Sequence, residues 1–515
     1  MIHRFLTTPL YYVNAEPHLG HTYTTIIADT LKRYFQSQGE TVFLLTGTDE
    51  HGDKIAQAAK EHNTEPKEYA DRISGLFRTT WDKCGIAYDH FIRTTDSYHR
   101  QTVQEILQAI YDTGDIYFGE YGGFYCYGCE RFYTEKELVA GKCPDHQKEP
   151  EFIQEKNYFF RMSKYQERLL DHIRANPELI YPERYRTEVL SFLREPLEDL
   201  CISRPKTRLQ WGIPLPFDTE YVTYVWFDAL INYVSALKYK GEEFFQTYWP
   251  TANHLIAKDI LKPHAIYWPT MLMAAGFPCY KHLYVHGYWI MDSGKMSKSL
   301  GNVVRPLEMQ QRYGMDAFRY FLLRDMVFGQ DATFSLETFV TRVNADLANN
   351  LGNLVSRVLA MQTKYFKGEV QPLGESWAEE DCKLRDVFTR AREDIRRHME
   401  GLYFNRAMEA IWVALDRTNQ YIVQTAPFVL MKDPTRHGRV GEILHHLLES
   451  LRVTAELLAP FLPETAGEIR ALLAISDPAH TSHAPWGSVF SPGHRIRPPK
   501  VLFPRIDTGD SESNS

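Results

Sequence analysis

His18, Gly20 and His21 lie together near the start of the chain, directly after Pro17. An apolar run, residues 5–13, precedes them and apolar residues at helical spacing follow, so we expect a strand-to-helix junction here. A helix N-terminus offers free N–H groups and a partial positive charge, which suit a phosphate group. Gly20 would let a nucleotide approach the backbone, and both histidines can donate hydrogen bonds to a charged transition state. Taken alone, these residues could equally be a helix cap.

A second candidate is a basic run late in the chain, in which Lys295, Ser297 and Lys298 follow Gly294. Two lysines beside small residues and a glycine suit a mobile loop that closes on phosphates. A lysine ammonium can neutralise the charge on a departing pyrophosphate. Taken alone, this run is more simply interpreted as a solvated surface loop.

Four residues have the spacing of metal ligands: Cys126, Cys129, Cys143 and His146, with 13 residues between the two pairs. Three thiolates and an imidazole suit tetrahedral Zn²⁺ and leave no open position for water. We therefore predict one structural zinc site rather than a catalytic one. Four unrelated residues, or a disulfide in an oxidising compartment, are the alternatives.

The elements that would position these residues begin with a strand-helix-strand-helix pattern over residues 2–60, whose second strand is predicted at 41–45. Such close alternation predicts a parallel sheet with right-handed crossovers. Residues 118–220 are rich in Tyr, Gly, Glu and Lys and are predicted to form an insertion. Alternation then returns, with strands predicted at 221–225, 254–257 and 282–290. After about residue 340 the pattern is helical only, with breaks at Gly and Pro, which predicts a separate helix bundle.

Composition places limits on the class of protein. The chain has 515 residues with 58 basic and 66 acidic side chains, a net charge of −8, which excludes a uniformly basic nucleic-acid binder. Its 44% hydrophobic content is that of a globular chain of about three domains. Seven cysteines are too few for a disulfide scaffold. With no apolar run of about 18–20 residues and no signal-peptide pattern, we expect a soluble, cytoplasmic protein.

His-Leu-Gly-His early and Lys-Met-Ser-Lys-Ser late, in that order on an α/β chain, resemble the paired signatures of the class I aminoacyl-tRNA synthetases. Within that class the chain resembles the methionyl-tRNA synthetase family, in its bacterial-type short form with one zinc knuckle. Segments 5–14, 46–52, 224–229, 258–260 and 346–354 carry this second resemblance. It implies a Rossmann-like parallel sheet domain split by a zinc-containing insertion, followed by an all-α helix bundle that binds the anticodon.

The resemblance also implies roles for individual residues. Catalysis would depend on His18, His21, Lys295 and Lys298, and ATP would contact these four together with Gly20, Asp259 and Ser297. The positions that match methionine-binding residues are Leu10, Tyr12, Asp49, Trp226, Ala229, Tyr233, His264 and Trp268. Asp49 would pair with the substrate ammonium, and aromatic rings suit a polarisable thioether. Without the resemblance, each buried aromatic would be interpreted as core packing.

Recognition of tRNA is implied for Asn349, Asn353 and Arg357, which are spaced to share one helix face. Amides can read the edges of unstacked bases, and arginine can bind phosphate or stack. The family commonly has a tryptophan after an Ala-Pro step, but Phe428 stands there in this chain. A phenyl ring can still stack on a base, with less area.

The domain boundaries expected on this basis are 1–117 and 221–290 for the two halves of the catalytic domain and 118–220 for the insertion. A stem-contact region would span 291–345 and the bundle 346–507, with a disordered tail at 508–515. The implied reaction activates L-methionine with ATP and Mg²⁺ to methionyl-adenylate. It then transfers the methionyl group to the 3′-terminal adenosine of methionine tRNA, initiator and elongator alike. The absence of a further C-terminal module favours a monomer, and no membrane partner is expected.

Other functions are consistent with parts of the pattern. Isoleucyl, valyl and leucyl enzymes need an editing domain, for which an insertion of about 100 residues looks too short. A cysteinyl enzyme usually recognises its substrate with an active-site metal, whereas the ligands here lie in the insertion. A nucleotidyltransferase that does not use tRNA would not need the bundle. A non-catalytic RNA-binding paralogue is disfavoured by the intact histidines and lysines.

Overall fold

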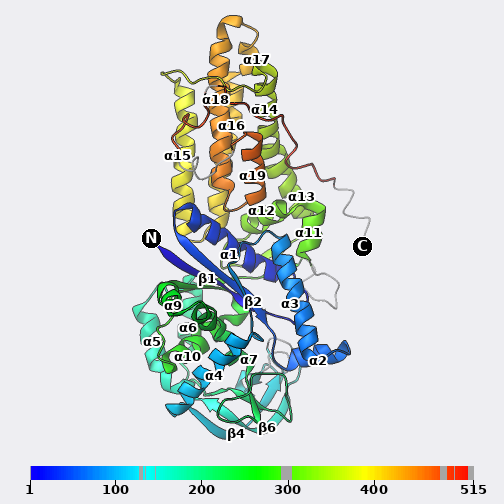
Figure 1. Ribbon diagram of the computed structural model, residues 1–515, viewed down its shortest axis with the longest axis vertical. Coiled ribbons are helices and arrows are strands. Elements are labelled where there is room, and N and C mark those ends of the chain that lie inside the picture. The colour runs from blue at the N-terminus through cyan, green and yellow to red at the C-terminus, as the bar shows by residue number, and fades with distance from the viewer. Residues whose placement is uncertain are drawn as a thin grey trace. The chain divides into compact units, whose positions relative to one another are not determined.

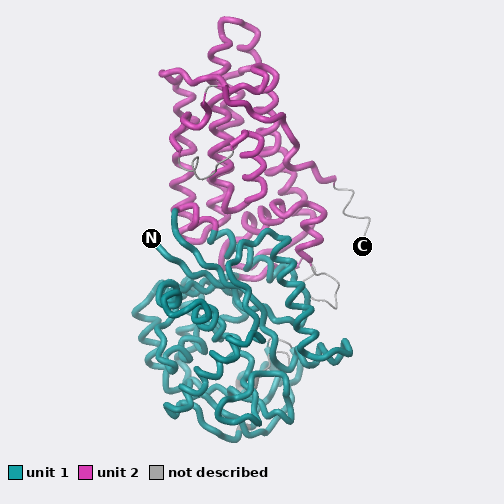
Figure 2. Tube along the Cα trace, in the orientation of Figure 1, with its two compact units in different colours: residues 1–32, 39–286 teal, residues 33–38, 287–515 magenta. Residues whose placement is uncertain are grey.

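The computed structural model describes residues 2–126, 131–133, 135–144, 147–291, 304–475, 484–491 and 493–507. The chain divides into two compact units (Figure 2). The first comprises residues 1–32 and 39–286, and the second comprises residues 33–38 and 287–515. Among the described residues, no helix is both long and apolar enough to cross a membrane.

The first unit is built on a six-stranded sheet with the order β3-β2-β1-β11-β12-β7, in which every neighbouring pair is parallel. The strands are β1 (His3–Tyr12), β2 (Thr41–Asp49), β3 (His90–Arg93), β7 (Ile180–Tyr181), β11 (Ala252–Ala257) and β12 (His282–His286). The predicted parallel sheet is confirmed. The chain leaves β1 toward β2 on one side and returns to β11 on the other. Ligands bind at such a switch point, beyond the carboxyl ends of the strands.

Helices between the strands cover the sheet, which explains why β2 is buried along nearly its whole length. They are α1 (Leu19–Ser37), α2 (Asp53–Glu61), α3 (Pro66–Lys83), α4 (Ser97–Asp112), α5 (Gln166–Ala175), α6 (Glu183–Phe192), α7 (Val225–Leu230), α8 (Asn232–Tyr239), α9 (Glu242–Tyr248) and α10 (Trp268–Ala274). Short helical turns flank β11: the 3₁₀ turns η3 (Trp249–Thr251) and η4 (Lys258–Ile260), and the π-helix η5 (Pro263–Tyr267), which leads into α10.

The predicted insertion contains a four-stranded antiparallel sheet with the order β5-β4-β6-β8. Its strands are β4 (Ile116–Cys126), β5 (Arg131–Tyr133), β6 (Glu151–Phe160) and β8 (Leu200–Cys201), with the 3₁₀ turns η1 (Glu135–Glu137) and η2 (Met162–Tyr165). The range 118–220 is not separate throughout, because β7 pairs with β12 in the parallel sheet. Leu169, Ile173 and Val189 of α5 and α6 also belong to the main core.

Two strand predictions were wrong in detail. The strand predicted at 221–225 is β10 (Tyr221–Thr223), which pairs with β9 (Ser203–Pro205) in an antiparallel ribbon outside the parallel sheet. The strand predicted at 282–290 is two strands, since β12 ends at His286 and β13 (Trp289–Met291) pairs with β14 (Ala332–Phe334). Gly287 separates them and approaches Gln330 so closely that a Cβ would lie 2.2 Å from its carbonyl oxygen. Strand propensity does not show which sheet a strand joins.

The second unit is mainly helical, as predicted. Its helices are α11 (Pro306–Tyr313), α12 (Met315–Asp325), α13 (Leu336–Arg342), the π-helix η7 (Val343–Gly352), α14 (Asn353–Phe366), α15 (Glu379–Glu400), α16 (Phe404–Thr425), α17 (Pro427–Leu430), the 3₁₀ turn η8 (Pro434–Arg436), α18 (His437–Leu458) and α19 (Pro463–Leu472). The long helices α15, α16 and α18 pack against one another (Figure 1). The expected break at Pro427 is made by Ala426, which has φ 41° and separates α16 from α17.

Candidate active site

The His-Leu-Gly-His residues lie at the carboxyl end of the central strand β1, where α1 begins. The rings of His18 and His21 stack with their centroids 3.8 Å apart. The backbone N–H of Gly20 donates to Nδ1 of His18 at 3.1 Å, so this nitrogen acts as an acceptor. A Cβ at Gly20 would lie 3.1 Å from Cε1 of His18. A glycine here therefore also leaves room for the His18 ring, a reason that the sequence did not suggest.

Two aromatic side chains, those of Tyr11 and Phe77, pack against the His21 ring. The rings of Tyr11 and Phe77 stack at 5.5 Å, and each has its centroid within 5.3 Å of the His21 ring. The Tyr11 hydroxyl lies 2.6 Å from Oγ1 of Thr25, one turn further along α1. These contacts hold the start of α1 against β1 and limit the motion of the histidine pair.

Three of the predicted methionine-binding side chains form a buried cluster: Tyr233 of α8, His264 of η5 and Trp268 of α10. The Tyr233 hydroxyl is 2.9 Å from Nε2 of His264, and Nδ1 of His264 donates to the Ile260 carbonyl at 3.0 Å. In the neutral ring, Nε2 must therefore accept a hydrogen bond from the Tyr233 hydroxyl. Burial lowers the pKa of His264 to about 4, so the ring is neutral. A π-helical turn such as η5 is frequent at functional sites.

His254 on β11 was missed by sequence reasoning. Its Nε2 accepts a hydrogen bond from Trp268 Nε1 at 3.2 Å, so its Nδ1 carries the proton that is shared with Thr7 Oγ1 at 2.8 Å. The His254 ring also lies 4.1 Å from the ring of Tyr233. Burial holds the pKa of His254 well below its usual value. A lone histidine on an apolar strand looks like core, and the only available signal was its place at the start of a predicted strand.

Of the other predicted methionine-binding residues, Leu10, Tyr12 and Trp226 are half-buried, and Asp49 and Ala229 are buried. The ring of Trp226 on α7 meets His264 edge to face at 6.4 Å, and Ala229 on the same helix is buried. Tyr12 is paired in register with Asp49 on the neighbouring strand, and Leu10 packs against the core. The remaining ATP-site prediction within the described residues, Asp259, is exposed in the turn η4 that follows β11. Lys295, Ser297 and Lys298 lie outside the described residues.

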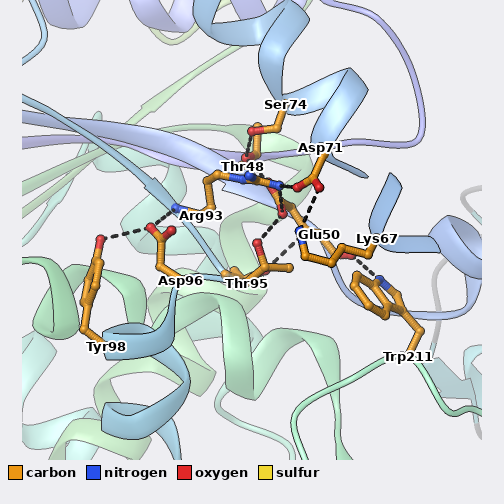
Figure 3. A network of polar contacts seen from close by, with 11 residues as sticks. Thr48, Glu50, Lys67, Asp71, Ser74, Arg93, Thr95, Asp96, Tyr98 and Trp211 are labelled. Atoms are coloured by element: carbon orange, nitrogen blue, oxygen red, sulfur yellow. Dashed lines mark hydrogen bonds and ion pairs between the residues drawn. The ribbon is translucent and has the colours of Figure 1, made fainter. Parts of the chain in front are cut away.

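The loop that follows Asp49 is held by a buried carboxylate, Glu50 (Figure 3). Arg93 at the end of β3 donates to both oxygens of Glu50 at 2.7 Å, and the hydroxyls of Thr48 and Thr95 donate at 2.7 and 2.6 Å. Arg93 also pairs with Asp71 of α3 at 2.5 Å. Four charge-assisted bonds satisfy the buried carboxylate. Asp49, the last residue of β2, is therefore followed directly by a residue that is tied to β3 and, through Arg93, to α3.

Comparison with known proteins identifies the family. The model for class I tRNA synthetases (M) matches residues 4–150 and 146–359, and the model for the anticodon-binding domain of methionyl tRNA ligase matches residues 371–515. The chain belongs to the methionyl-tRNA synthetase family. It is accordingly a ligase that uses ATP to charge tRNA with methionine.

Individual relatives agree with this assignment. The methionine–tRNA ligase of Caldanaerobacter subterraneus subsp. tengcongensis is 46% identical, with 98% of this chain and 79% of the relative covered. The ligase of Bacillus subtilis is 42% identical, with 98% and 78% covered. The Mycobacterium tuberculosis methionyl-tRNA synthetase solved with methionyl-adenylate is 39% identical and superposes with a TM-score of 0.93, covering 98% of this chain and all of that one. Its ligand-free form has a TM-score of 0.85 at 37% identity, with 98% and 99% covered.

The metal-ligand pattern of this synthetase family member lies partly outside the described residues, which include Cys126 and Cys143 but not Cys129 or His146. Both described cysteines are buried and form a small cluster with Tyr133. The Sγ of Cys143 lies 3.5 Å from the Tyr133 hydroxyl. Two buried thiols in a cluster that contains so few apolar residues are chemically compatible with zinc ligation.

The residues matching the family's anticodon positions lie in the second unit. Asn349 is in η7, Asn353 begins α14 and Arg357 follows one turn later, and all three are exposed. The neighbouring Asn350 instead donates to Asp416 of α16 at 2.7 Å. Phe428 on α17 is 52% exposed.

Proposed function

We propose that the two steps of the family's reaction take place at the carboxyl end of β1, and the observation that carries this proposal is the stacked His18–His21 pair at the start of α1. In the first step a methionine carboxylate oxygen attacks the α-phosphorus of ATP in line. A carboxyl–phosphate bond forms and the bond to pyrophosphate breaks. His18, His21 and the N-terminus of α1 stabilise the charge that develops on the phosphate oxygens. No protein nucleophile takes part.

Residues that are identified from the sequence alone would complete the phosphate-binding site. Lys295 and Lys298 would neutralise the leaving pyrophosphate, and Ser297 would contact the same group. Asp259 would lie on the adenosine side, since it follows β11 at the same edge of the sheet. ATP would bind together with Mg²⁺.

The methionine side chain would bind against the cluster of Tyr233, His264 and Trp268, with Leu10, Tyr12, Trp226 and Ala229 around it. Since the Tyr233 hydroxyl and the Trp268 N–H both hydrogen bond to histidines, the polar atoms of these two rings are satisfied within the cluster, and aromatic rings suit a thioether. Asp49 would hold the ammonium group.

In the second step a hydroxyl of the terminal tRNA adenosine attacks the carbonyl of the adenylate, the ester forms and AMP leaves. Asn349, Asn353 and Arg357 would read the anticodon, and a base would stack on Phe428. Initiator and elongator methionine tRNAs share the anticodon and would both be bound.

Single-turnover formation of methionyl-adenylate tests the first step. Lys295→Ala should slow adenylate formation while methionine affinity changes little, because the lysine acts on charge that appears only as pyrophosphate departs. An unchanged rate of adenylate formation would refute the role of this lysine. His21→Asn should also slow this step.

We further propose that Cys126, Cys129, Cys143 and His146 hold one structural Zn²⁺. The burial of Cys126 and Cys143 supports this assignment, because a metal can fix an antiparallel insertion that has a small core. Mass spectrometry of the metal content should find one zinc per chain, and none in Cys143→Ser. A metal-free wild-type chain with an unchanged melting temperature would contradict the proposal.

The resemblance also supports a cytoplasmic monomer. Sedimentation should then give a single species near 60.0 kDa, and a species of twice that mass would contradict the monomer.

A further inference from the structure

Asp228 on α7 is fully buried and hydrogen bonded to two histidines. Its Oδ2 accepts from Nδ1 of His51 at 2.6 Å, and its Oδ1 accepts from Nε2 of His99 at 2.8 Å. Nδ1 of His99 lies 2.7 Å from the hydroxyl of Ser235. All four side chains are buried, and they come from the loop after β2, from α4, from α7 and from α8. This series of hydrogen bonds therefore joins four separate elements of the first unit.

A buried carboxylate is costly to keep unless its charge is compensated. Burial of Asp228 favours the neutral acid, but the charge and hydrogen bond of His51 and the hydrogen bond of His99 outweigh it and hold its pKa below the usual value. The arrangement thus depends on all three residues. Removing one acceptor oxygen leaves a buried histidine N–H without its partner.

Two members of this series of hydrogen bonds, Asp228 and His51, lie next to residues of the proposed methionine site. Asp228 lies on α7 between Trp226 and Ala229, which belong to the pocket wall. His51 follows Asp49 by two residues, and its backbone carbonyl accepts the Tyr12 hydroxyl proton at 3.0 Å. The hydrogen bond between His51 and Asp228 therefore joins the loop that directly follows Asp49 (the Asp49 loop) to α7, which carries Trp226 and Ala229.

We propose that Asp228 is a positioning residue for methionine: through His51 and His99 it keeps the Asp49 loop and the α7 wall at the spacing that methionine needs. The inference rests on the proposed assignment of the methionine pocket. Asp228 itself need not touch the substrate. Arg93 of β3, which also pairs with Asp71 of α3, holds Glu50 in the same loop, so His51 is the link on the α7 side.

The Asp228→Asn variant separates this role from general stability. An amide has one acceptor oxygen, so either His51 or His99 would face an N–H₂ group, and the loop would shift from the wall. We expect KM for methionine in ATP–pyrophosphate exchange to rise about tenfold, as for loss of one buried hydrogen bond, with KM for ATP changed less than about twofold. Asp228→Glu, which retains two acceptor oxygens, should recover part of the methionine affinity.

Asp115→Asn is the matched control. Asp115 is also a buried carboxylate of the first unit, and its partners, Lys164 at 2.7 Å and the Tyr165 hydroxyl at 2.6 Å, are not residues of the proposed pocket. This variant should lose stability without changing the ratio of the two KM values. If Asp228→Asn raises both KM values equally, or raises neither, the positioning role is wrong. If Asp228→Asn does not fold, His99→Gln serves for the same comparison.

Trp226→Ala keeps failure of this inference distinct from failure of the pocket assignment. If it leaves KM for methionine unchanged, the proposed pocket is wrong and the inference falls with it. If Trp226→Ala raises KM for methionine while Asp228→Asn does not, the pocket stands and only the positioning role is overturned.

Discussion

The Tyr233 hydroxyl donates a hydrogen bond of 2.9 Å to Nε2 of His264, and the Nδ1–H group of His264 donates a hydrogen bond to the carbonyl of Ile260. Both rings are buried, so the pair fixes one tautomer of His264 and one direction of the Tyr233 hydroxyl. Trp268 donates a similar hydrogen bond to His254, whose ring lies 4.1 Å from that of Tyr233. The cluster is thus a set of rings held in place by their own polar atoms.

The first prediction is that Tyr233→Phe weakens methionine binding. The change leaves Nε2 of His264 buried without its hydrogen-bond donor. This should destabilise the folded protein by about 1–3 kcal/mol and allow the His264 ring to turn. Calorimetric titration with methionine should show a dissociation constant raised about fivefold or more. Tyr165→Phe, which loses a 2.6 Å bond to Asp115 instead, should leave this constant unchanged. Equal affinities in wild type and Tyr233→Phe would contradict the account.

The second prediction concerns pH. The pKa of His264 is lowered by burial from 6.5 to about 4, so between these values the unfolded chain binds a proton that the folded chain does not. The contribution of His264 to stability is full above pH 6.5 and falls as the pH falls toward 4. From pH 7 to pH 5 the loss is about 2 kcal/mol.

Urea denaturation at the two pH values measures this contribution. The wild-type chain should lose more unfolding free energy between pH 7 and pH 5 than His264→Gln does, because glutamine does not titrate. The other titratable groups are present in both proteins, so their contributions to the pH dependence of stability cancel in the comparison. Equal losses would show that His264 titrates normally in the folded protein.

The third prediction concerns the bidentate pair of Arg93 and Glu50. In Arg93→Met the carboxylate of Glu50 remains buried and loses two of its donors, so the free energy of unfolding should fall by about 3 kcal/mol. KM for methionine should rise too, since Asp49 is adjacent. The matched control is Arg174→Met, whose exposed pair with Asp171 is 3.8 Å long and should contribute less than about 1 kcal/mol. A similar loss of stability in both variants would be evidence against the network's role.

The position of His18 and His21 could be predicted from the sequence because a strand, a junction and a helix are local patterns. The support for Asp49 could not, since Arg93 and Glu50 are 43 residues apart and meet only through the pairing of β2 with β3. Strand patterns show residue types but not partners. The two-residue strand β7 was likewise too short to leave a periodic signal.

The fourth prediction concerns tRNA. Arg357 is exposed on α14, in the unit that does not contain the histidine pair. Arg357→Gln should lower kcat/KM for charging of methionine tRNA by about tenfold and leave ATP–pyrophosphate exchange unchanged, because exchange does not require tRNA. Arg396→Gln, an exposed residue of α15, is the control and should change neither rate. A loss of exchange in Arg357→Gln would contradict the separation of these roles.

The most direct test of the whole account is amino-acid-dependent ATP–pyrophosphate exchange on the zinc-replete wild-type protein. Methionine should be compared with leucine, isoleucine, cysteine and homocysteine. The proposed methionine pocket predicts strong exchange with methionine and with no other protein amino acid in the set. Strong exchange with leucine or isoleucine, or no exchange with methionine, would contradict the pocket built from Tyr233, His264 and Trp268.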